Sequence, residues 1–291
     1  MQEVNRREFM VRTAGVVAVT WNAPLVGQAQ GPTLTATTPR PLGKTGLQCT
    51  LLGVGTGVKA WGGNSELIRK GRDTFMGVLQ RAYEKGIRYF DMADMYGAHP
   101  YMKEALKKFI HRDQVTLLTK TVSREPHLVR TDVERFRKEL DTDRLDIVML
   151  HCVNDPDWSN KLKGCMDVLE DFKAKGVLRA HGVSSHSLEA SRRAAETEWV
   201  DVLLERINPF GIKMDAPPDQ VAPVLKKAHE NGKGVLGMKI AGEGQCRDKI
   251  AESLKFVMGL GCVDAMPIGF LDPGEIDSAF GHVAQAAVAS A

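Results

Sequence analysis

Asp91, Tyr96, Lys120 and His151 are residues of this chain whose types and spacing could do chemistry together. Each ends or follows a short apolar run, so polar groups recur at the ends of successive strand-like segments. A phenol is a poor proton donor at neutral pH, because its ordinary pKa is about 10. A nearby ammonium could lower that pKa, and a carboxylate could keep the ammonium charged. A neutral imidazole could donate a hydrogen bond to a carbonyl oxygen.

These four groups suit the reduction of a carbonyl group to an alcohol. Tyr96 would protonate the alkoxide that forms when hydride reaches the carbonyl carbon, and His151 would orient the oxygen. Lys120 and Asp91 would tune the phenol. Since no side chain supplies hydride, the reaction needs an organic hydride carrier. Each residue alone also fits a structural role in a buried ion pair, at a rim or at a strand end, but their joint position favours catalysis.

Eight short apolar runs, rich in β-branched residues, are typical of buried parallel strands. The segments between them place apolar residues three and four positions apart, which indicates helices with one face on a sheet. After the third run, Thr131 and Glu134 match a capping box, although Pro126 allows an earlier helix start. The eight runs cover residues 51–55, 89–90, 115–118, 147–150, 181–184, 202–207, 235–238 and 265–269.

Strands that alternate with helices predict right-handed parallel crossovers, and eight such units close into a (β/α)8 TIM barrel. The alternative architecture is an open, doubly wound sheet. A typical barrel needs about 250 residues, which is close to the length that remains after the N-terminal segment. We therefore expect one α/β barrel domain over residues 41–291.

The segment 1–29 resembles a twin-arginine export signal. An arginine pair at residues 6–7 precedes Phe9, a mildly apolar stretch covers residues 14–21, and the small residues at 27–29 suit a signal peptidase. The alternative is a surface helix with a chance pair of arginines. The apolar stretch is too short to span a bilayer as a permanent anchor.

A cleaved signal predicts a soluble mature protein that begins near Gln30, with a flexible lead-in over residues 30–40. We expect a periplasmic or secreted protein that passes through the twin-arginine translocation machinery and keeps no stable membrane anchor. The formal net charge of +3 gives no electrostatic footprint for nucleic acid. The five cysteines show no ligand-like spacing, so the sequence predicts neither a disulfide framework nor a metal site.

Several motifs resemble the aldo-keto reductase family, and the likeness extends over most of residues 40–285. Residues 41–46 with 52–56 are similar to the family's N-terminal hairpin and first strand, and residues 90–97 to its F-D-x-A-x-x-Y-G signature. Residues 140–151 are similar to the motif that follows. The resemblance implies a TIM barrel that binds NADPH or NADH without a Rossmann fold.

The resemblance also implies a role for each polar residue. It assigns Tyr96 as the general acid, Lys120 and Asp91 as its tuning pair, and His151 as the residue that orients the substrate. These roles match those expected from the chemistry of the four groups. The chain is therefore expected to be an NAD(P)-dependent oxidoreductase acting on small-molecule aldehydes, ketones or the corresponding alcohols.

The cofactor motifs of the family are matched only in part. Residues 182–185 are similar to G-V-S-N, with Ser185 replacing the asparagine that holds the nicotinamide carboxamide. Leu204 stands where a glutamine is usual, and Met238 where a tyrosine stacks on the nicotinamide ring. Glycines after the seventh run could let backbone amides approach a pyrophosphate. The predicted cofactor residues are Gly55, Thr56, Ser184, Ser185, Met238, Lys239, Gly242, Gly244 and Gly269.

Residues 269–273 lack the basic side chains that the family commonly uses for the adenosine 2′-phosphate, so NADP is expected from the resemblance and NAD stays possible. We expect the substrate to contact the loops after the first and sixth runs, with Trp61, Trp158 and Phe210 as apolar walls. The departures at the cofactor positions keep a catalytically idle, nucleotide-binding barrel as an alternative. A metal-dependent hydrolase is a weaker one, because His151 has no histidine partner at ligand spacing.

Overall fold

Eight parallel strands form the inner sheet of the computed structural model, which describes residues 34–288. The predicted signal segment 1–29 lies outside the described residues. Every apolar run that predicted a strand overlaps one to within one residue at each end of the run, which confirms the strand predictions. The strands are β3 (Leu52–Gly55), β4 (Tyr89–Asp91), β5 (Thr116–Thr121), β6 (Leu145–Val153), β7 (Leu178–Ser185), β8 (Val202–Arg206), β9 (Gly234–Met238) and β10 (Met266–Ile268).

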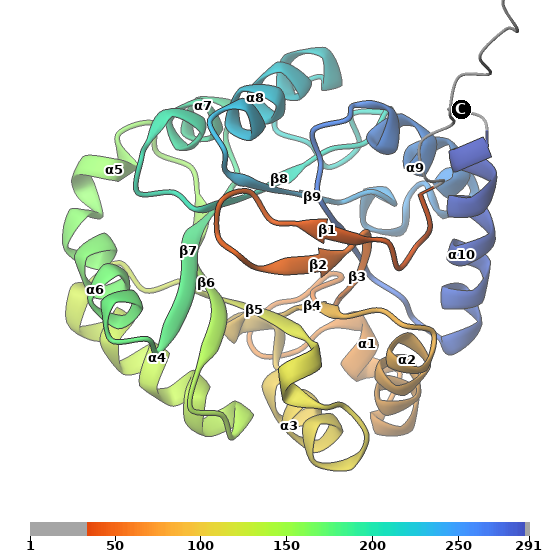
Figure 1. Cartoon of the computed structure of the whole chain (residues 1–291), viewed down its shortest axis with the longest axis horizontal. Helices are drawn as coiled ribbons and strands as arrows, with labels where there is room; N and C mark the ends of the chain where they lie inside the picture. Colours follow the sequence, from red (N-terminus) through yellow and green to blue (C-terminus); the bar gives the residue numbers. More distant parts are fainter. Residues whose placement is uncertain (1–33, 289–291) are drawn as a thin grey trace, which may run out of the picture. The chain divides into compact units, whose positions relative to one another are not determined.

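The sheet closes into a barrel. Its strand order is β10, β3, β4, β5, β6, β7, β8, β9, so neighbours in the sequence are neighbours in the sheet. The two end strands, β9 and β10, are joined by a parallel pairing of Leu236 with Ala265, and the Gly237 N–H donates to the Ala265 carbonyl oxygen at 3.0 Å. The helices form an outer ring around these strands (Figure 1). The (β/α)8 barrel is confirmed, and an open doubly wound sheet is excluded.

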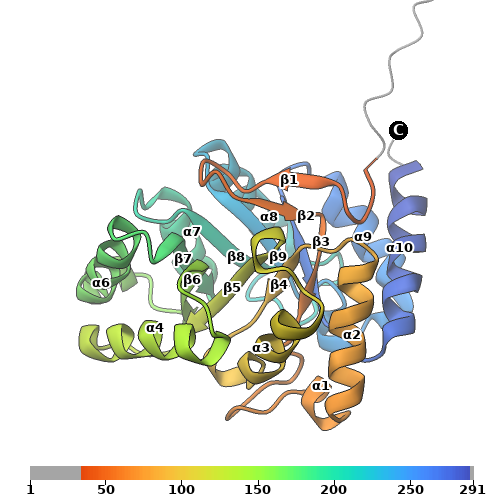
Figure 2. The same ribbon diagram turned by 60° about the horizontal axis from the view of Figure 1, so that its bottom comes forward.

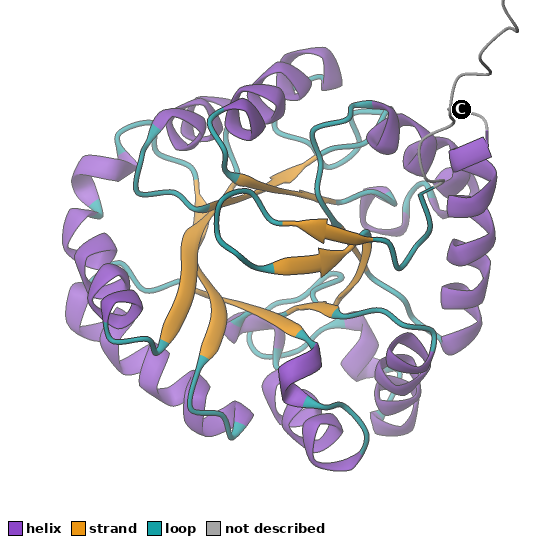
Figure 3. Cartoon of the chain, in the orientation of Figure 1, coloured by secondary structure: helices purple, strands orange, loops and turns teal. Residues whose placement is uncertain are grey.

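The helices lie around the outside of the sheet (Figures 2 and 3). Their buried apolar residues pack with those of the strands in one core cluster. The helix after β5 begins at Pro126, whose missing N–H is tolerated in the first turn. Thr131 lies inside that helix and donates to the His127 carbonyl oxygen at 2.9 Å, so the capping box prediction is wrong. The longer helices are α2 (Arg72–Glu84), α3 (His99–Lys108), α4 (Pro126–Leu140), α6 (Lys163–Ala174), α7 (Leu188–Glu196), α8 (Pro218–Glu230), α9 (Ile250–Gly259) and α10 (Pro273–Val288), and the short ones are α1 (Glu66–Arg69) and α5 (Trp158–Lys161).

The core has two layers, because successive side chains of a strand point to opposite faces. On β6, Val148 and Leu150 belong to the layer between the sheet and the helices, whereas Ile147 and Met149 belong to the layer inside the barrel. The antiparallel hairpin of β1 (Pro39–Pro41) and β2 (Gln48–Thr50) covers the N-terminal end of the barrel (Figure 1). Its apolar side chains join the inner layer.

Residues 34–40 of the predicted lead-in 30–40 pack on the barrel, which corrects the flexibility expected for them. Ala36 is buried in the core, and its carbonyl oxygen accepts a hydrogen bond from the Leu52 N–H at 2.9 Å. The Leu51 N–H donates to the Thr38 carbonyl oxygen at 3.1 Å. These backbone bonds attach the lead-in to the start of β3.

All five cysteines lie in the described part of the chain and are unpaired. Within residues 34–288, no helix combines the length and apolar character that a membrane crossing requires.

Candidate active site

The barrel brings the four predicted catalytic residues to one end of the sheet. Asp91 ends β4, Lys120 lies near the end of β5 and His151 near the end of β6, while Tyr96 lies on the 3-10 turn η1 (Asp94–Tyr96) that follows β4. The Lys120 ammonium pairs with the Asp91 carboxylate and donates to the Met92 carbonyl oxygen at 2.8 Å. The Tyr96 hydroxyl lies 3.3 Å from His151 Nε2. The carboxyl ends of parallel barrel strands are where active sites form.

The turn that carries Tyr96 is held by contacts on both sides. Asp94 pairs with Arg135 of α4 at 2.8 Å, which ties the turn to the outer ring. The ammonium of Lys120 lies 4.8 Å from the centre of the Tyr96 ring, a cation–π arrangement. Among the described residues, the hydrogen bonds of that ammonium go to Asp91 and Met92, and it meets the phenol through the ring face.

Burial governs the protonation of Tyr96. Loss of solvent and the nearby Asp91 carboxylate raise the pKa of Tyr96 well above its ordinary value. The pKa of Tyr96 therefore moves in the opposite direction to the one expected from Lys120, because burial is the largest effect on it. The phenol keeps its proton at neutral pH, which is the form that a general acid requires.

Asp91 and Lys120 form a coupled buried pair. Burial raises the pKa of Asp91, and the adjacent ammonium opposes that rise. Burial lowers the pKa of Lys120, and the adjacent carboxylate opposes that fall. Each charge thus depends on the other, since neither side chain keeps enough water to solvate it alone.

His151 is neutral in this environment. Burial, followed by the charge of Lys120, lowers the pKa of His151 to about 2. Its Nδ1 atom has no hydrogen-bond partner among the described residues, whereas Nε2 faces Tyr96. His186 lies beside His151, with ring centres 6.3 Å apart. It is also neutral, because burial and the Arg206 guanidinium lower the pKa of His186 to about 3. A neutral imidazole can share a proton with a hydroxyl or carbonyl oxygen without placing a charge in the site.

A β-bulge interrupts the pairing of β6 with β7 around His151. Leu150 pairs with Val183 and Val153 with Ser185, so β6 has one extra residue in this stretch. The backbone of Cys152 accommodates it with φ 54°, in the left-handed region that favours glycine. Bulges next to active sites redirect the end of a strand.

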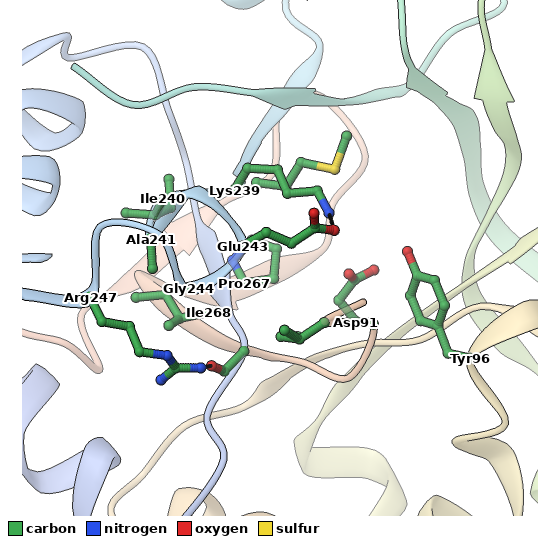
Figure 4. A pocket seen from close by; sticks show the side chains of 15 residues that line it. Asp91, Tyr96, Lys239, Ile240, Ala241, Glu243, Gly244, Arg247, Pro267 and Ile268 are labelled. Carbon is green, nitrogen blue, oxygen red and sulfur yellow. Dashed lines mark hydrogen bonds and ion pairs between the residues drawn. The ribbon is translucent and has the colours of Figure 1, made fainter. Parts of the chain in front are cut away.

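A cleft runs from Tyr96 along the ends of β3, β9 and β10 (Figure 4). Tyr96 and Asp91 lie at one end and Arg247 at the other (Figure 4). Lys239 pairs with Glu243 between these ends. The predicted cofactor residues that line this cleft are Gly55, Met238, Lys239, Gly244 and Gly269.

A comparison with models of protein families identifies the family of this chain. Residues 53–257 match the model of the Aldo/keto reductase family. The chain belongs to this family. Aldo-keto reductase YhdN of Bacillus subtilis is 30% identical over 161 residues, which is 50% of this chain and 46% of that protein. The chain spans about half the length of the curated relatives it matches.

Solved structures of aldo-keto reductases share the fold. A Pseudomonas aeruginosa protein described as an aldo-keto reductase has a TM-score of 0.72 and 24% identity, covering 88% of this chain and 98% of that one. An aldo-keto reductase from Klebsiella pneumoniae in complex with NADPH has a TM-score of 0.64 and 20% identity, covering 84% of this chain and 89% of that one. At these identities the likeness is one of fold.

Four of the predicted cofactor residues of this aldo/keto reductase family member lie outside the lining of the cleft: Thr56, Ser184, Ser185 and Gly242. All four are buried. Thr56 donates its hydroxyl to the Asp91 carbonyl oxygen at 2.9 Å. Ser184 accepts from the Cys152 N–H at 3.2 Å, and Ser185 donates to the Ser187 carbonyl oxygen at 3.0 Å. The Ser184 side chain therefore holds the backbone of β6 at the bulge.

The three predicted substrate walls differ in exposure. Trp61 is 79% exposed on the loop after β3. Phe210 is half-buried, with the Lys249 ammonium 5.1 Å from its ring centre. Trp158 is 1% exposed in the core and donates its indole N–H to the Ala190 carbonyl oxygen at 3.3 Å. Trp158 cannot form a wall of an open site, so that prediction is wrong.

The sequence predictions missed part of the cleft and a cluster beside it. The Arg206 guanidinium lies 2.9 Å from His186 Nδ1 and 2.9 Å from Asp215. Among residues 34–288, no cluster of three or more His, Cys, Asp or Glu side chains could hold a metal ion.

The missed cleft residues flank the predicted ones, so extending each predicted loop by a few positions would have found them: Gly57, Val58, Ile240, Ala241, Glu243, Arg247, Pro267 and Ile268.

Proposed function

We propose that this chain is an NAD(P)H-dependent oxidoreductase that reduces aldehydes or ketones to alcohols, or catalyses the reverse reaction. The observation that carries the proposal is the 3.3 Å separation between the Tyr96 hydroxyl and Nε2 of a neutral His151, beside the buried Asp91–Lys120 pair. Family membership supports the same reaction class.

Each residue has a distinct role in the proposal. Tyr96 donates its proton to the oxygen of the substrate as that oxygen gains negative charge. His151 orients the oxygen through Nε2 and, being neutral, adds no second cation beside Lys120. Lys120 stabilises negative charge on the phenol after proton transfer, and Asp91 keeps Lys120 in place.

The cleft beside Tyr96 fits a nicotinamide dinucleotide. Met238 offers a polarisable side chain near Tyr96, and Lys239 offers a cation for the pyrophosphate. Gly244 and Gly269 leave the backbone open to close approach. When bound, the dinucleotide supplies hydride. We propose NADP(H) as the cofactor, consistent with the NADPH complex of the Klebsiella structure, and NAD(H) as the alternative.

The test is a turnover assay on the purified protein, with NADPH and NADH offered separately against a panel of aldehydes and ketones. The proposal predicts that reduced nicotinamide is consumed only when a carbonyl compound is present, and that mass spectrometry finds the matching alcohol. Dinucleotide binding without turnover on the whole panel would instead favour the catalytically idle barrel. Loss of activity on adding a chelator would favour the metal-dependent alternative.

We also propose that the protein is exported by the twin-arginine route with its dinucleotide already bound. The arginine pair at residues 6–7 and the small residues at 27–29 motivate this, and free nicotinamide cofactors are scarce outside the cytoplasm. Cell fractionation should find the wild type in the periplasm and the Arg6→Lys/Arg7→Lys variant in the cytoplasm. Denaturing the periplasmic protein should release nicotinamide dinucleotide. Equal distribution of the two proteins would refute the route, and release of no dinucleotide would refute the loading before export.

A further inference from the structure

Gly57, on the loop after β3, lies against the ring of Tyr96. A Cβ atom added to Gly57 would be 2.8 Å from the Tyr96 Cδ2 atom and closer still to Cε2 and Cζ. Real Cβ atoms essentially never approach a heavy atom so closely. The backbone of Gly57 is outside the left-handed region that favours glycine. The lack of a side chain is therefore required by the Tyr96 ring and not by the backbone.

The loop after β3 also contacts the backbone of the turn that carries Tyr96. The Gly63 N–H donates to the Met95 carbonyl oxygen at 3.0 Å. Gly97, which ends the turn with φ 70°, packs so closely on the Gly63 carbonyl group that an added Cβ would collide with its oxygen. We call Gly57, Gly63 and Gly97 the glycine clamp. It holds the loop after β3 against both the ring of Tyr96 and the backbone beside it.

We propose that Gly57 is a positioning residue that sets where the Tyr96 hydroxyl lies relative to His151. Since the loop is anchored at Met95 and Gly97, a methyl group at position 57 is accommodated by movement of the Tyr96 ring. That movement carries the hydroxyl away from its 3.3 Å contact with His151 Nε2. The effect on catalysis rests on the proposed function, whereas the effect on the ring does not.

The first experiment compares Gly57→Ala with Gly259→Ala. Gly259 is exposed on α9, has no heavy atom within 4 Å of an added Cβ and is remote from the clamp in sequence. For Gly57→Ala we expect kcat to fall by about tenfold to a hundredfold, since small misplacements of catalytic groups have effects of that size. Gly259→Ala should keep wild-type kcat; equal kcat in both variants would overturn the proposal.

A second measurement reads the position of the ring without catalysis. The chain has four tyrosines, so protein labelled with 3-fluorotyrosine gives four fluorine resonances, and Tyr96→Phe identifies that of Tyr96. Gly57→Ala should shift the Tyr96 resonance and leave the other three in place. An unshifted resonance would overturn the proposal even if kcat fell. If the wild type reduces no carbonyl compound, the proposed function fails, but this measurement still tests the clamp.

A double variant covers the case in which Gly57→Ala fails to fold. Removing the ring with Tyr96→Ala also removes the collision, so adding Gly57→Ala to that background should leave the Tm unchanged. The same substitution in the wild type should lower the Tm or displace the ring. A further loss of Tm in the Tyr96→Ala background would show that Gly57 serves the backbone, which contradicts the proposal.

Discussion

At the scale of single residues, burial determines the charge states in the site. The types and order of Asp91, Tyr96, Lys120 and His151 were enough to predict that they converge, because parallel strands end at one edge. The raised pKa of Tyr96 could not be predicted, since it depends on how much solvent the barrel excludes. The sequence shows which groups are present but not how far each is desolvated.

The Asp91–Lys120 pair leads to a prediction about stability. Lys120→Met leaves the Asp91 carboxylate buried without a partner, which should lower the free energy of unfolding by about 3–5 kcal/mol. Asp91→Leu/Lys120→Met removes both charges and should be more stable than the single variant. Urea unfolding measures both. A double variant no more stable than Lys120→Met would contradict the coupling of the two charges.

The lowered pKa of His151 predicts a pH dependence. The unfolded chain takes up a proton near pH 6.5 and the folded chain only near pH 2, so unfolded molecules bind more protons between these values. The free energy of unfolding should therefore fall as the pH drops below 6.5, by up to about 1.4 kcal/mol per pH unit for this residue. In urea titrations His151→Gln should reduce that slope, whereas His127→Gln, at an exposed position, should keep it. Equal slopes in both variants would rule out a buried neutral imidazole at position 151.

At the scale of elements, the regular parts were predictable and the irregular parts were not. The apolar runs located all eight strands of the barrel, because burial on both faces leaves a continuous apolar signal. The bulge at Cys152 left no such signal, so the contact between the Cys152 N–H and the Ser184 hydroxyl could not be predicted. The start of α4 was decided by Pro126, which fixes the first turn, and not by Thr131.

The bulge can be tested through its left-handed residue. Cys152→Gly should keep the fold and the turnover, because glycine adopts φ 54° without strain. Cys152→Val places a β-branched residue there and should lower the free energy of unfolding by about 1–3 kcal/mol. Guanidinium unfolding compares the two variants. The prediction fails if valine is tolerated as well as glycine.

At the scale of the whole molecule, the barrel separates stability from chemistry. The eight-unit pattern and the chain length predicted the closed barrel, since few architectures accommodate eight alternating units. The spatial neighbours of loops were less predictable. Trp158 was expected at the site but lies in the core, and the lead-in was expected to be flexible but packs on β3. Such contacts join segments that are distant in sequence and carry no local pattern.

The hairpin of β1 and β2 provides a test of whether the two ends of the barrel serve stability and catalysis separately. Leu42 is fully buried in the inner layer, at the end opposite Tyr96. Leu42→Ala should lower the free energy of unfolding by about 2–5 kcal/mol, because it removes a packed side chain and leaves a cavity. The kcat of the folded variant should equal that of the wild type. A large change in kcat at full folding would show that the two ends are coupled.

The central claim is that the Tyr96 hydroxyl is the proton donor of a carbonyl reduction, and the most direct measurement compares Tyr96→Phe with Tyr101→Phe. Tyr101 stacks on Phe75 with ring centres 4.2 Å apart, so its variant removes a phenol hydroxyl elsewhere on the same protein. With NADPH and an aldehyde that the wild type reduces, the account predicts that Tyr96→Phe binds NADPH but loses nearly all turnover, whereas Tyr101→Phe keeps wild-type kcat. Unchanged turnover in Tyr96→Phe would contradict it.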